Sequence, residues 1–314
     1  MTIHGATTTR PSLNAHLFEH GGVSDALRHL ITHIARASKY ISYAIHTTEA
    51  GLEGNVNQFG EEQQKLDVLS DDIVRQHLLE SHLVSAYVSE EQPEMRELDS
   101  DAPYAVAFDP LDGSSLIEAN FSIGSIFGIY EGNTIIGRKP AEQVAALYVL
   151  YGPRTLLVYS TGNGVHMFIL NEVGEYMLLE SHLGVADDAK NYSPGNLRAL
   201  DDNEGYKKTM DRWLSQKLTL RYSGCMVADI HHILSKGQGI FTNVGGSKYP
   251  DGKLRLAFEC GPFSYLVEQA GGAASDGKQR ILLKTITSID QRTPLIIGSK
   301  NEVKRVISEI AMKG

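Results

Sequence analysis

The segment YAVAFDPLDGSS, residues 104–115, decides how this chain is interpreted. Its first five residues are apolar or aromatic and predict a short buried strand. Asp109 leaves the carboxyl end of that strand, Pro110 stiffens the exit, and Asp112 follows one turn later. Both carboxylates can therefore face one point, as hard divalent cations require of oxygen ligands.

The residues after Asp112 are suited to bind a phosphate. Gly113, Ser114 and Ser115 offer backbone N–H groups that no large side chain obstructs, together with two hydroxyl groups. A metal site and a phosphate site would then share a border. The alternative is an ordinary Asp-Pro or Asp-Gly turn at a strand end. The whole motif after a buried strand favours the functional interpretation.

Further acids are predicted to reach the same place. Glu90 and Glu91 end the apolar run 83–88, so a neighbouring strand can deliver acids to the same sheet edge. A solvated pair of surface glutamates is the alternative for these two, and the nearby DPLDGSS motif favours function. Glu259 lies between an apolar run and a helix predicted from Pro262, beside an N-terminus whose partial positive charge suits anions.

Other charged residues leave two interpretations open. Lys253 and Arg255 lie two apart on one face of a predicted strand, where they could bind a sugar phosphate or only deter edge aggregation. Glu61, Glu62 and Asp67 precede or begin a predicted helix, so they either cap that helix or include a base that orients water. The 12 histidines show no metal-binding spacing, and we do not expect them to be ligands.

The composition is that of a soluble globular protein. The 314 residues are 42% hydrophobic and 21% charged, enough for a sizeable core in one large domain or two smaller ones. The net charge is 29 − 38 = −9 without a basic cluster, which predicts no nucleic-acid partner. No apolar run approaches the roughly 20 residues of a membrane helix, so no membrane association is expected. The two cysteines, Cys225 and Cys260, suit a reducing compartment.

The apolar pattern predicts an α/β chain with a mixed sheet. Residues 1–22 are expected to form a flexible N-terminal arm, residues 23–190 an N-terminal α+β subdomain with the metal and phosphate site, and residues 191–314 a C-terminal α/β subdomain with the candidate sugar-phosphate cations Lys253 and Arg255. Helices are expected over 23–45, 63–79, 206–216, 225–235, 262–270 and from 302. Strands are expected over 83–88, 104–108, 121–130, 145–151, 155–159, 165–170, 176–179, 254–258 and 295–298.

From about Val23 onward the chain closely resembles the class I fructose-1,6-bisphosphatase family. The resemblance is carried by DPLDGSS, by an upstream SEE, and by KLRLAFEC running into a helix. The phrases VNQFGEEQ, YSPGNLRA, KGQGIFTNV, AASDGK and IGSKNEV are similar to the sedoheptulose-1,7-bisphosphatase branch. The resemblance implies a layered α/β/α/β/α sugar-phosphatase fold and a role in carbohydrate metabolism. The implied reaction is Mg²⁺-dependent removal of the 1-phosphate from sedoheptulose-1,7-bisphosphate, fructose-1,6-bisphosphate or both.

The resemblance also implies roles for individual residues. The implied ligands of two or three Mg²⁺ ions per subunit, with Mn²⁺ as an alternative, are Glu61, Glu90, Asp109, the Leu111 carbonyl, Asp112 and Glu259. The implied catalytic residues are Asp67 and Glu91, which would activate water, and Glu90. The implied substrate-binding residues are Asp112, Gly113, Ser114, Ser115, Asn196, Arg221, Tyr222, Lys253 and Arg255.

The chain departs from the family pattern in three respects. Ala199 and Asn243 stand where the family usually places two tyrosines around the far phosphate, which is consistent with a seven-carbon substrate. VSDAL replaces a TGEL-like stretch, and Pro103 stands where a lysine is usual, so AMP inhibition is not implied. The disulfide-forming cysteines of chloroplast enzymes are not evident, which argues against redox switching.

Two other functions are alternatives to this one. An inositol-monophosphatase-like enzyme would take its later acid from a WDxAAG-like motif, whereas Trp213, the only tryptophan, is followed by Leu214 and Ser215. A non-catalytic sugar-phosphate sensor should have lost some of the acids.

Arg221 and the family resemblance predict a homotetramer or homodimer. We expect a cytoplasmic location, with a plastid form that has lost its leader as the alternative.

Overall fold

The computed structural model describes residues 10–19, 22–47, 52–56 and 62–311, with residues 52–56 and 62–64 described by their backbone alone. The α-helices are α1 (Leu13–Glu19), α2 (Asp25–Thr47), α3 (Lys65–Ser81), α4 (Glu204–Ser215), α5 (Met226–Lys236), α6 (Gly261–Gln269) and α7 (Lys300–Ala311). The strands are β1 (Leu52–Val56), β2 (Glu62–Gln64), β3 (Val84–Ser89), β4 (Arg96–Glu97), β5 (Tyr104–Asp112), β6 (Ile123–Glu131), β7 (Gln143–Tyr151), β8 (Thr155–Ser160), β9 (His166–Leu170), β10 (Tyr176–Glu180), β11 (Asn191–Gly195), β12 (Thr219–Leu220), β13 (Ile240–Asn243), β14 (Leu254–Arg255), β15 (Ala273–Ser275), β16 (Arg292–Thr293) and β17 (Leu295–Gly298). Short 3₁₀ segments and one π-helix lie between them at Ser114–Leu116, Pro140–Glu142, Leu197–Asp201, Leu256–Cys260 and Ile281–Leu283.

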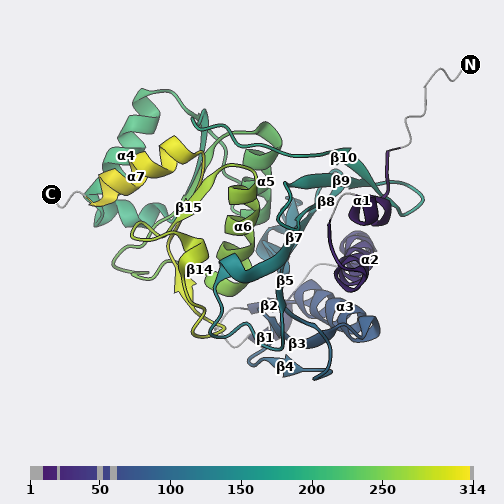
Figure 1. The fold of residues 1–314 in the computed structure, drawn as a ribbon. Coiled ribbons are helices and arrows are strands. Elements are labelled where there is room, and N and C mark those ends of the chain that lie inside the picture. Colours follow the sequence, from purple (N-terminus) through teal and green to yellow (C-terminus); the bar gives the residue numbers. More distant parts are fainter. Residues whose placement is uncertain (1–9, 20–21, 48–51, 57–61, 312–314) are drawn as a thin grey trace, which may run out of the picture.

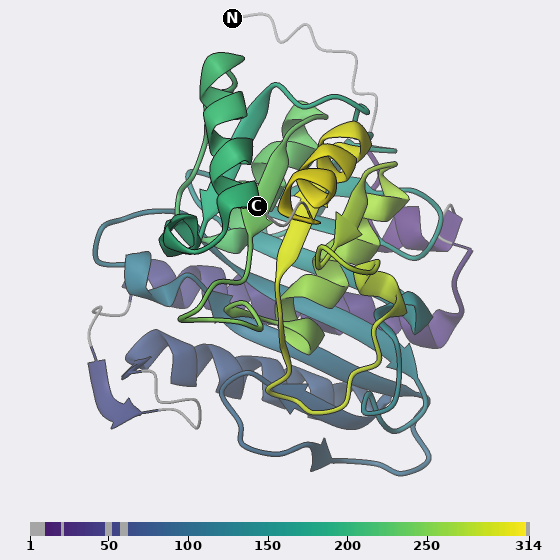
Figure 2. The same cartoon turned by 90° about the vertical axis from the view of Figure 1, so that its left-hand side faces the viewer.

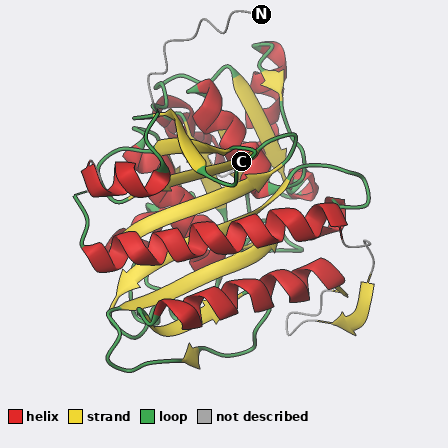
Figure 3. Ribbon diagram, turned by 90° about the vertical axis from the view of Figure 1, so that its right-hand side faces the viewer, coloured by secondary structure: helices red, strands yellow, loops and turns green. Residues whose placement is uncertain are grey.

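A large mixed sheet forms the centre of the N-terminal half. Its eight strands follow the order β10-β9-β8-β7-β6-β5-β3-β4, in which β3 and β5 are parallel and the other neighbours are antiparallel. Helices α1, α2 and α3 cover one face, and Figure 3 views the sheet from that side. Helices α5 and α6 cover the other face (Figure 1).

A second sheet lies on the far side of α5 and α6. Its five strands follow the order β12-β11-β13-β17-β15. Its inner face shares the core cluster of α5 and α6, whereas its outer face packs against α4 and α7. Figure 2 shows α4 and α7 in front of this sheet. The chain therefore has five layers, and the predicted α/β/α/β/α fold with mixed sheets is confirmed.

Alternating side chains of β5 reach two different cores, as expected for a strand covered on both faces. Ala105 and Ala107 face α5 and α6, whereas Val106 and Phe108 face the helices of the other layer. All residues from Tyr104 to Leu111 are buried. The end of β5 therefore opens between packed layers, and that end carries the acidic motif.

No helix of the described residues is long and apolar enough to span a membrane.

The expected flexible arm over residues 1–22 is wrong where the structure describes it. Residues Leu13–Glu19 form α1, whose Leu13, His16 and Leu17 are buried. The backbone of Pro11 accepts a hydrogen bond from Leu178 of β10 at 2.9 Å, which ties this segment to the edge of the large sheet. The sequence pattern missed α1 because seven residues are too short for a helical period to be recognised.

The packing of α1 leads to a prediction about the free energy of unfolding. Leu17 is only 1% exposed, whereas its neighbour Phe18 is 72% exposed. We expect Leu17→Ala to lower the free energy of unfolding by about 2–4 kcal/mol, because truncation leaves a cavity in the core. Phe18→Ala, the matched control, should change it by less than about 0.5 kcal/mol. Urea unfolding followed by circular dichroism measures both. A loss below about 0.5 kcal/mol for Leu17→Ala would mean that α1 is not docked.

The predicted strand over residues 254–258 is wrong in its second half. Only Leu254 and Arg255 are extended, paired antiparallel with β16, and the chain then turns into a π-helix over Leu256–Cys260 that continues into α6. The apolar run could not distinguish the two structures, since a buried helical turn and a buried strand have the same composition. Glu259 consequently lies inside the helical segment rather than in front of it. Single π-turns of this kind occur often at functional sites.

Candidate active site

A β-bulge places Asp109 and Asp112 on the same side of β5. In the pairing with β6, Asp109 lies opposite Ile126 and Asp112 opposite Gly124, so two residues of β5 face one residue of β6. Residues three apart on a regular strand would point to opposite faces. The extra residue restores the common face. The Ser125 hydroxyl donates a hydrogen bond to the Pro110 carbonyl at 2.7 Å, which holds the bulge.

Asp112 is held by the beginning of α5. Its Oδ2 accepts a hydrogen bond from the backbone N–H of Val227 at 2.8 Å, and the Cys225 thiol lies 3.1 Å from the same oxygen. The N-terminus of a helix favours a negative charge, so this contact supports the ionised carboxylate. Asp109 is fixed locally, because its Oδ1 accepts the backbone N–H of Leu111 at 2.9 Å.

Glu90 and Glu259 reach the same region from two other elements. Glu90 follows β3, and its backbone N–H donates to the Phe108 carbonyl at 3.1 Å, which keeps it beside β5. Its carboxylate is paired with the guanidinium of Arg255. The backbone N–H of Arg255 donates to Glu259 Oε2 at 2.6 Å. Arg255 therefore links both glutamates, and its side chain is directed at the acids.

These four acids form an electrostatically strained group, which we call the acid cluster: Glu90, Asp109, Asp112 and Glu259. Burial, and then the charges of Glu90 and Asp112, raise the pKa values of Asp109 and Glu259 well above their usual range. Burial raises the pKa of Asp112 to about 6, although the N–H of Val227 opposes that shift. The contact between β5 and the π-helix, and the links from Arg255 to Glu90 and Glu259, bring these acids into one region.

The acid cluster fits a hard divalent cation by its chemistry. It offers carboxylate oxygens, the ligand type that Mg²⁺ and Mn²⁺ prefer, and these oxygens repel one another without a cation. Within the described residues no three acids, histidines or cysteines surround one point as they stand. Glu90 pairs instead with Arg255, whose cation provides part of the missing positive charge. Glu61, a further predicted ligand, lies outside the described residues.

The segment Asp112–Ser115 forms a tight turn next to the acid cluster. Gly113 has a φ of +83°, and Ser114–Leu116 then form one turn of 3₁₀-helix. A Cβ atom at position 113 would lie 2.9 Å from the Cys225 Cβ, closer than real Cβ contacts. Glycine is therefore required both by the left-handed backbone and by the approach of Cys225. Ser114 is partly buried and Ser115 is exposed.

The predicted water-activating residues lie at the start of α3 and in the turn after β3. Asp67 is 5% exposed in the first turn of α3, and Glu91 is partly exposed after β3. A further acid of α3, Asp71, joins α3 to the end of β3. Asp71 accepts hydrogen bonds from the Ser89 hydroxyl at 2.5 Å and from Gln92 Nε2 at 2.8 Å. It thus fixes the turn that carries Glu90 and Glu91.

The predicted sugar-binding residues occupy the second sheet and its loops. Asn196 follows β11 and donates from Nδ2 to the Val244 carbonyl at 2.6 Å. Tyr222 is half-exposed, and its pKa is raised by burial and by the charges of Asp229 and Asp112. Arg221 is exposed.

The two basic residues predicted on one strand face have different neighbours. The ammonium of Lys253 lies 5.1 Å from the centre of the Tyr249 ring, a cation–π contact that leaves it near the loop after β13. Arg255 is 4% exposed and paired with Glu90. The short β14 therefore does not present them as an equivalent pair of phosphate-binding cations.

Asp229 was not singled out from the sequence. It is 4% exposed in the first turn of α5, and its Oδ1 accepts the backbone N–H of Ser223 at 2.8 Å. This contact shapes the turn that joins Tyr222 to Cys225. An acid in the first turn of a helix has a sufficient explanation in the helix dipole, so nothing in the sequence set it apart.

Comparison with known proteins identifies the family. The model described as "Fructose-1-6-bisphosphatase, N-terminal domain" matches residues 7–181, and the model described as "Fructose-1-6-bisphosphatase, C-terminal domain" matches residues 185–311. The chain therefore belongs to the fructose-1,6-bisphosphatase family.

Individual relatives cover nearly the whole chain. A class 1 fructose-1,6-bisphosphatase from Geobacter sulfurreducens is 46% identical over 303 residues, which is 95% of each chain. A chloroplastic sedoheptulose-1,7-bisphosphatase from Triticum aestivum is 41% identical over 88% of this chain and 71% of its own. The crystal structure of Leishmania major fructose-1,6-bisphosphatase in its holo form has a TM-score of 0.90 at 33% identity, covering 96% of this chain and 99% of its own. The fold and the order of the motifs are thus shared along both halves.

The raised pKa values predict how metal and pH act together on stability. An acid whose folded-state pKa is raised stabilises the fold fully only below its unfolded pKa of about 4, and loses that contribution as the pH rises through the raised value. For Asp112, whose folded-state pKa is about 6, the stabilising contribution falls as the pH rises from about 4 through about 6. A metal ion that binds the ionised acids should therefore raise the melting temperature more at about pH 8 than at about pH 5.5.

Thermal melting with and without Mg²⁺ at the two pH values measures this effect. The rise in melting temperature caused by Mg²⁺ should be largely lost in Asp109→Asn, because this variant removes one buried ligand charge. Asp101→Asn, which changes an exposed acid in the loop before β5, is the matched control and should keep it. An equal rise at both pH values in the parent protein would contradict the proposed linkage.

Proposed function

We propose that this chain is a metal-dependent sugar-bisphosphate phosphatase that hydrolyses the 1-phosphate of sedoheptulose-1,7-bisphosphate, fructose-1,6-bisphosphate or both. The observation that carries the proposal is the acid cluster beside the Asp112–Ser115 turn. Membership of the fructose-1,6-bisphosphatase family supports the same reaction. Because relatives bearing both enzyme names align with the chain, the family alone does not select between the two sugars.

Each part of the site has a distinct task in this proposal. The acid cluster and the Leu111 carbonyl would hold two or three Mg²⁺ ions, with Glu61 at the edge of the site. When bound, these ions supply positive charge for the phosphate and lower the pKa of a coordinated water. The turn from Asp112 to Ser115 would hold the 1-phosphate by backbone N–H and hydroxyl groups.

The chain's own side chains then position the reactants. Asp67 and Glu91 would accept the proton of the attacking water, while Tyr222 and Asn196 orient the sugar. Lys253 would bind the far phosphate, and Arg221 would reach the site of a neighbouring subunit. Phosphoryl transfer depends mainly on positioning and charge neutralisation, so few covalent steps are left to the protein.

Phosphate release tests the proposal directly. The purified chain is supplied with fructose-1,6-bisphosphate, sedoheptulose-1,7-bisphosphate or inositol monophosphate, each with Mg²⁺ and with a chelator. We expect release from at least one sugar bisphosphate in Mg²⁺ alone. Release only from inositol monophosphate would favour the inositol-monophosphatase-like alternative. Binding of sugar bisphosphate without release of phosphate from any substrate would favour the sensor.

One structural observation bears on the inositol-phosphatase alternative. Trp213 is fully buried between α4 and α7, where its Nε1 donates to Glu302 Oε1 at 2.6 Å. It therefore packs in the outer layer, and the residues after it, Leu214 and Ser215, do not form the WDxAAG-like motif. In the proposed site the later acid would be Glu259, which lies in the π-helix.

We infer further that the protein works in the cytoplasm as a homotetramer or homodimer. Exposed Arg221 and the family membership support the assembly. Light scattering of the purified chain measures its mass in solution. A monomeric mass at the concentrations used for activity would contradict the oligomer.

A further inference from the structure

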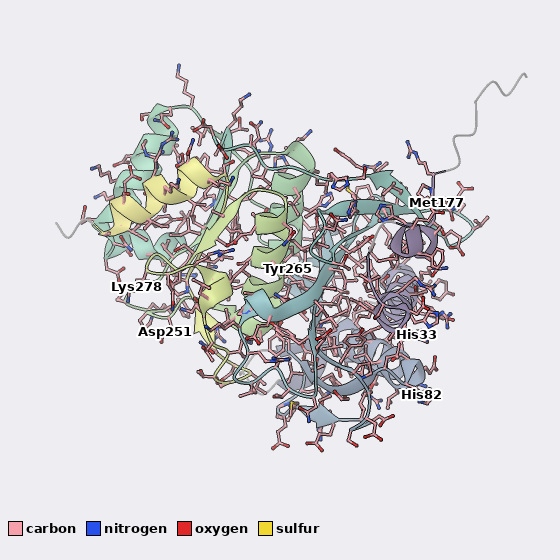
Figure 4. The ribbon with its side chains drawn as sticks, in the orientation of Figure 1. His33, His82, Met177, Asp251, Tyr265 and Lys278 are labelled. Atoms are coloured by element: carbon pink, nitrogen blue, oxygen red, sulfur yellow. The ribbon has the colours of Figure 1, made fainter. Side chains whose placement is uncertain are left out.

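Asp71 is a buried acid in α3 that lies level with the end of β3. It is only 2% exposed. His82, labelled in Figure 4, has a φ of +53° and turns the chain from α3 back into β3. The helix from Asp71 to Ser81 is about 15 Å long. The strand from Val84 to Ser89 is about 17 Å long, so Ser89 reaches Asp71.

Both oxygens of the Asp71 carboxylate accept a hydrogen bond. The Ser89 hydroxyl donates to Oδ1 at 2.5 Å, and Gln92 Nε2 donates to Oδ2 at 2.8 Å. Arg75, four residues further along α3, pairs with Asp72 instead. Burial raises the pKa of Asp71, and the two hydrogen bonds oppose that shift because they favour the ionised form. Burying an acid that is bonded only to neutral groups is costly, so packing alone does not account for Asp71.

The two donors stand at the two ends of the turn that follows β3, residues 89–92, which we call the glutamate turn. Ser89 is the last residue of the strand, and the Gln92 N–H closes the turn by donating to the Ser89 carbonyl at 3.2 Å. The Ser89 hydroxyl gives its single proton to Asp71 and accepts the Glu91 N–H at 3.2 Å. One carboxylate therefore holds both ends of the glutamate turn.

The glutamate turn is also held from its other side. The Glu90 N–H donates to the Phe108 carbonyl of β5 at 3.1 Å. Glu90 belongs to the acid cluster, and Glu91 is one of the two predicted water-activating residues. Because both acids belong to a turn fixed between α3 and β5, a shift of that turn moves both of them.

Asp67, the other predicted water-activating residue, lies on the same face of α3 as Asp71. Residues four apart stand one above the other on a helix, and both of these acids are buried. The bonds from Asp71 to the glutamate turn therefore set where this helix face lies relative to Glu90 and Glu91.

We propose that Asp71 is a positioning residue, whose carboxylate fixes the glutamate turn against α3 so that Glu90 and Glu91 keep their places relative to Asp67. A carboxylate suits this task because two donors approach its two oxygens at once, whereas an amide has a single accepting oxygen. Hydrogen bonds that orient metal ligands in this way typically change metal affinity or activity by about 10- to 100-fold when they are lost. This inference rests on the proposed function.

The first test is Asp71→Asn, which keeps the shape of the side chain but replaces one acceptor with a donor. We expect kcat for the sugar bisphosphate to fall about 10-fold, KM to stay within about 2-fold, and the affinity for Mn²⁺ in a calorimetric titration to fall about 10-fold. Asp72→Asn is the matched control, because it makes the same change one residue along, in an exposed ion pair with Arg75. It should leave all three quantities within about 2-fold.

A reciprocal exchange separates positioning from a general loss of stability. Gln92→Glu alone brings a second carboxylate to Asp71 and should also lower kcat about 10-fold. In the double variant Asp71→Asn with Gln92→Glu, the new amide donates to the new carboxylate while its oxygen still accepts from Ser89. Both kcat and the Mn²⁺ affinity should return to within about 3-fold of the parent values.

Gln92→Leu keeps the test decisive if Asp71→Asn does not fold. It removes one donor at a partly exposed position and should lower kcat and the Mn²⁺ affinity at least about 3-fold.

Three results would overturn the inference: losses that simply add in the double variant, an Asp71→Asn protein that matches Asp72→Asn in kcat and Mn²⁺ affinity, or an unchanged Gln92→Leu. A parent protein that releases phosphate from neither sugar bisphosphate would instead overturn the proposed function, and the Mn²⁺ affinities would still test the role of Asp71.

Discussion

Asp109→Asn is expected to reduce phosphate release by at least about 10³-fold while changing the affinity for the sugar product by less than about 3-fold. Asp109 is 5% exposed, and its pKa is raised by burial and by the charges of Glu90 and Asp112. Its ionised form is therefore disfavoured in the folded chain, and a bound cation would offset that cost. The amide variant keeps the shape and can still accept the N–H of Leu111, so the fold should survive.

The measurement pairs kcat/KM at saturating Mg²⁺ with calorimetric binding of the sugar monophosphate product. Asp101→Asn serves as the control, because it makes the same chemical change at an exposed position before β5. It should retain at least half of the parent activity. Near-normal Mg²⁺-dependent turnover in Asp109→Asn would show that the acid cluster is not the metal site.

Gly113→Ala is expected to lower both the stability of the fold and the rate of turnover. The residue has a φ of +83°, and a new Cβ would lie 2.9 Å from the Cys225 Cβ and 3.0 Å from its Sγ. Backbone strain and the clash together should lower the free energy of unfolding by about 2–4 kcal/mol. Moving the Asp112–Ser115 turn by a fraction of an ångström to relieve that clash should lower kcat/KM about 100-fold, because the turn sets the position of the phosphate.

A second glycine provides a matched control for this variant. Gly137 has a φ of +85°, and a Cβ added there would meet no atom within 4 Å, so Gly137→Ala carries the same backbone strain without the clash. It should lose about 1 kcal/mol of stability and keep its turnover. Adding Cys225→Gly to Gly113→Ala should recover part of both losses. Equal losses in Gly113→Ala and Gly137→Ala would contradict the role of the turn.

Much of the fold could be predicted from apolar periodicity. Helices α2 and α3 and strands β3 and β5 through β10 lie within a few residues of their expected positions, because each buries a continuous face or run. The short strands β11 and β13 were missed. The strand Asn191–Gly195 contains a proline and ends in glycine, so its sequence alone is typical of a loop. Its strand conformation depends on pairing with β12 and β13, which are distant in sequence.

The residue types of the active site were predictable, but their arrangement was not. The sequence placed Asp109 and Asp112 near each other, yet their common face depends on a bulge that only the β5–β6 register reveals. The pairing of Arg255 with Glu90 joins residues 165 positions apart and could not be read from local pattern. Asn243 was noticed as a departure from a family pattern, whereas its buried oxygen, unpartnered within the described residues, is a property of the folded chain.

The most direct test of the account is to locate the metal. Crystals of the parent protein grown with Mn²⁺ and a sugar monophosphate would be examined by anomalous diffraction. We expect Mn²⁺ bound to at least two of the acids Glu90, Asp109, Asp112 and Glu259, beside the Asp112–Ser115 turn. Mn²⁺ bound only elsewhere, in a protein that still shows Mn²⁺-dependent phosphate release, would contradict it.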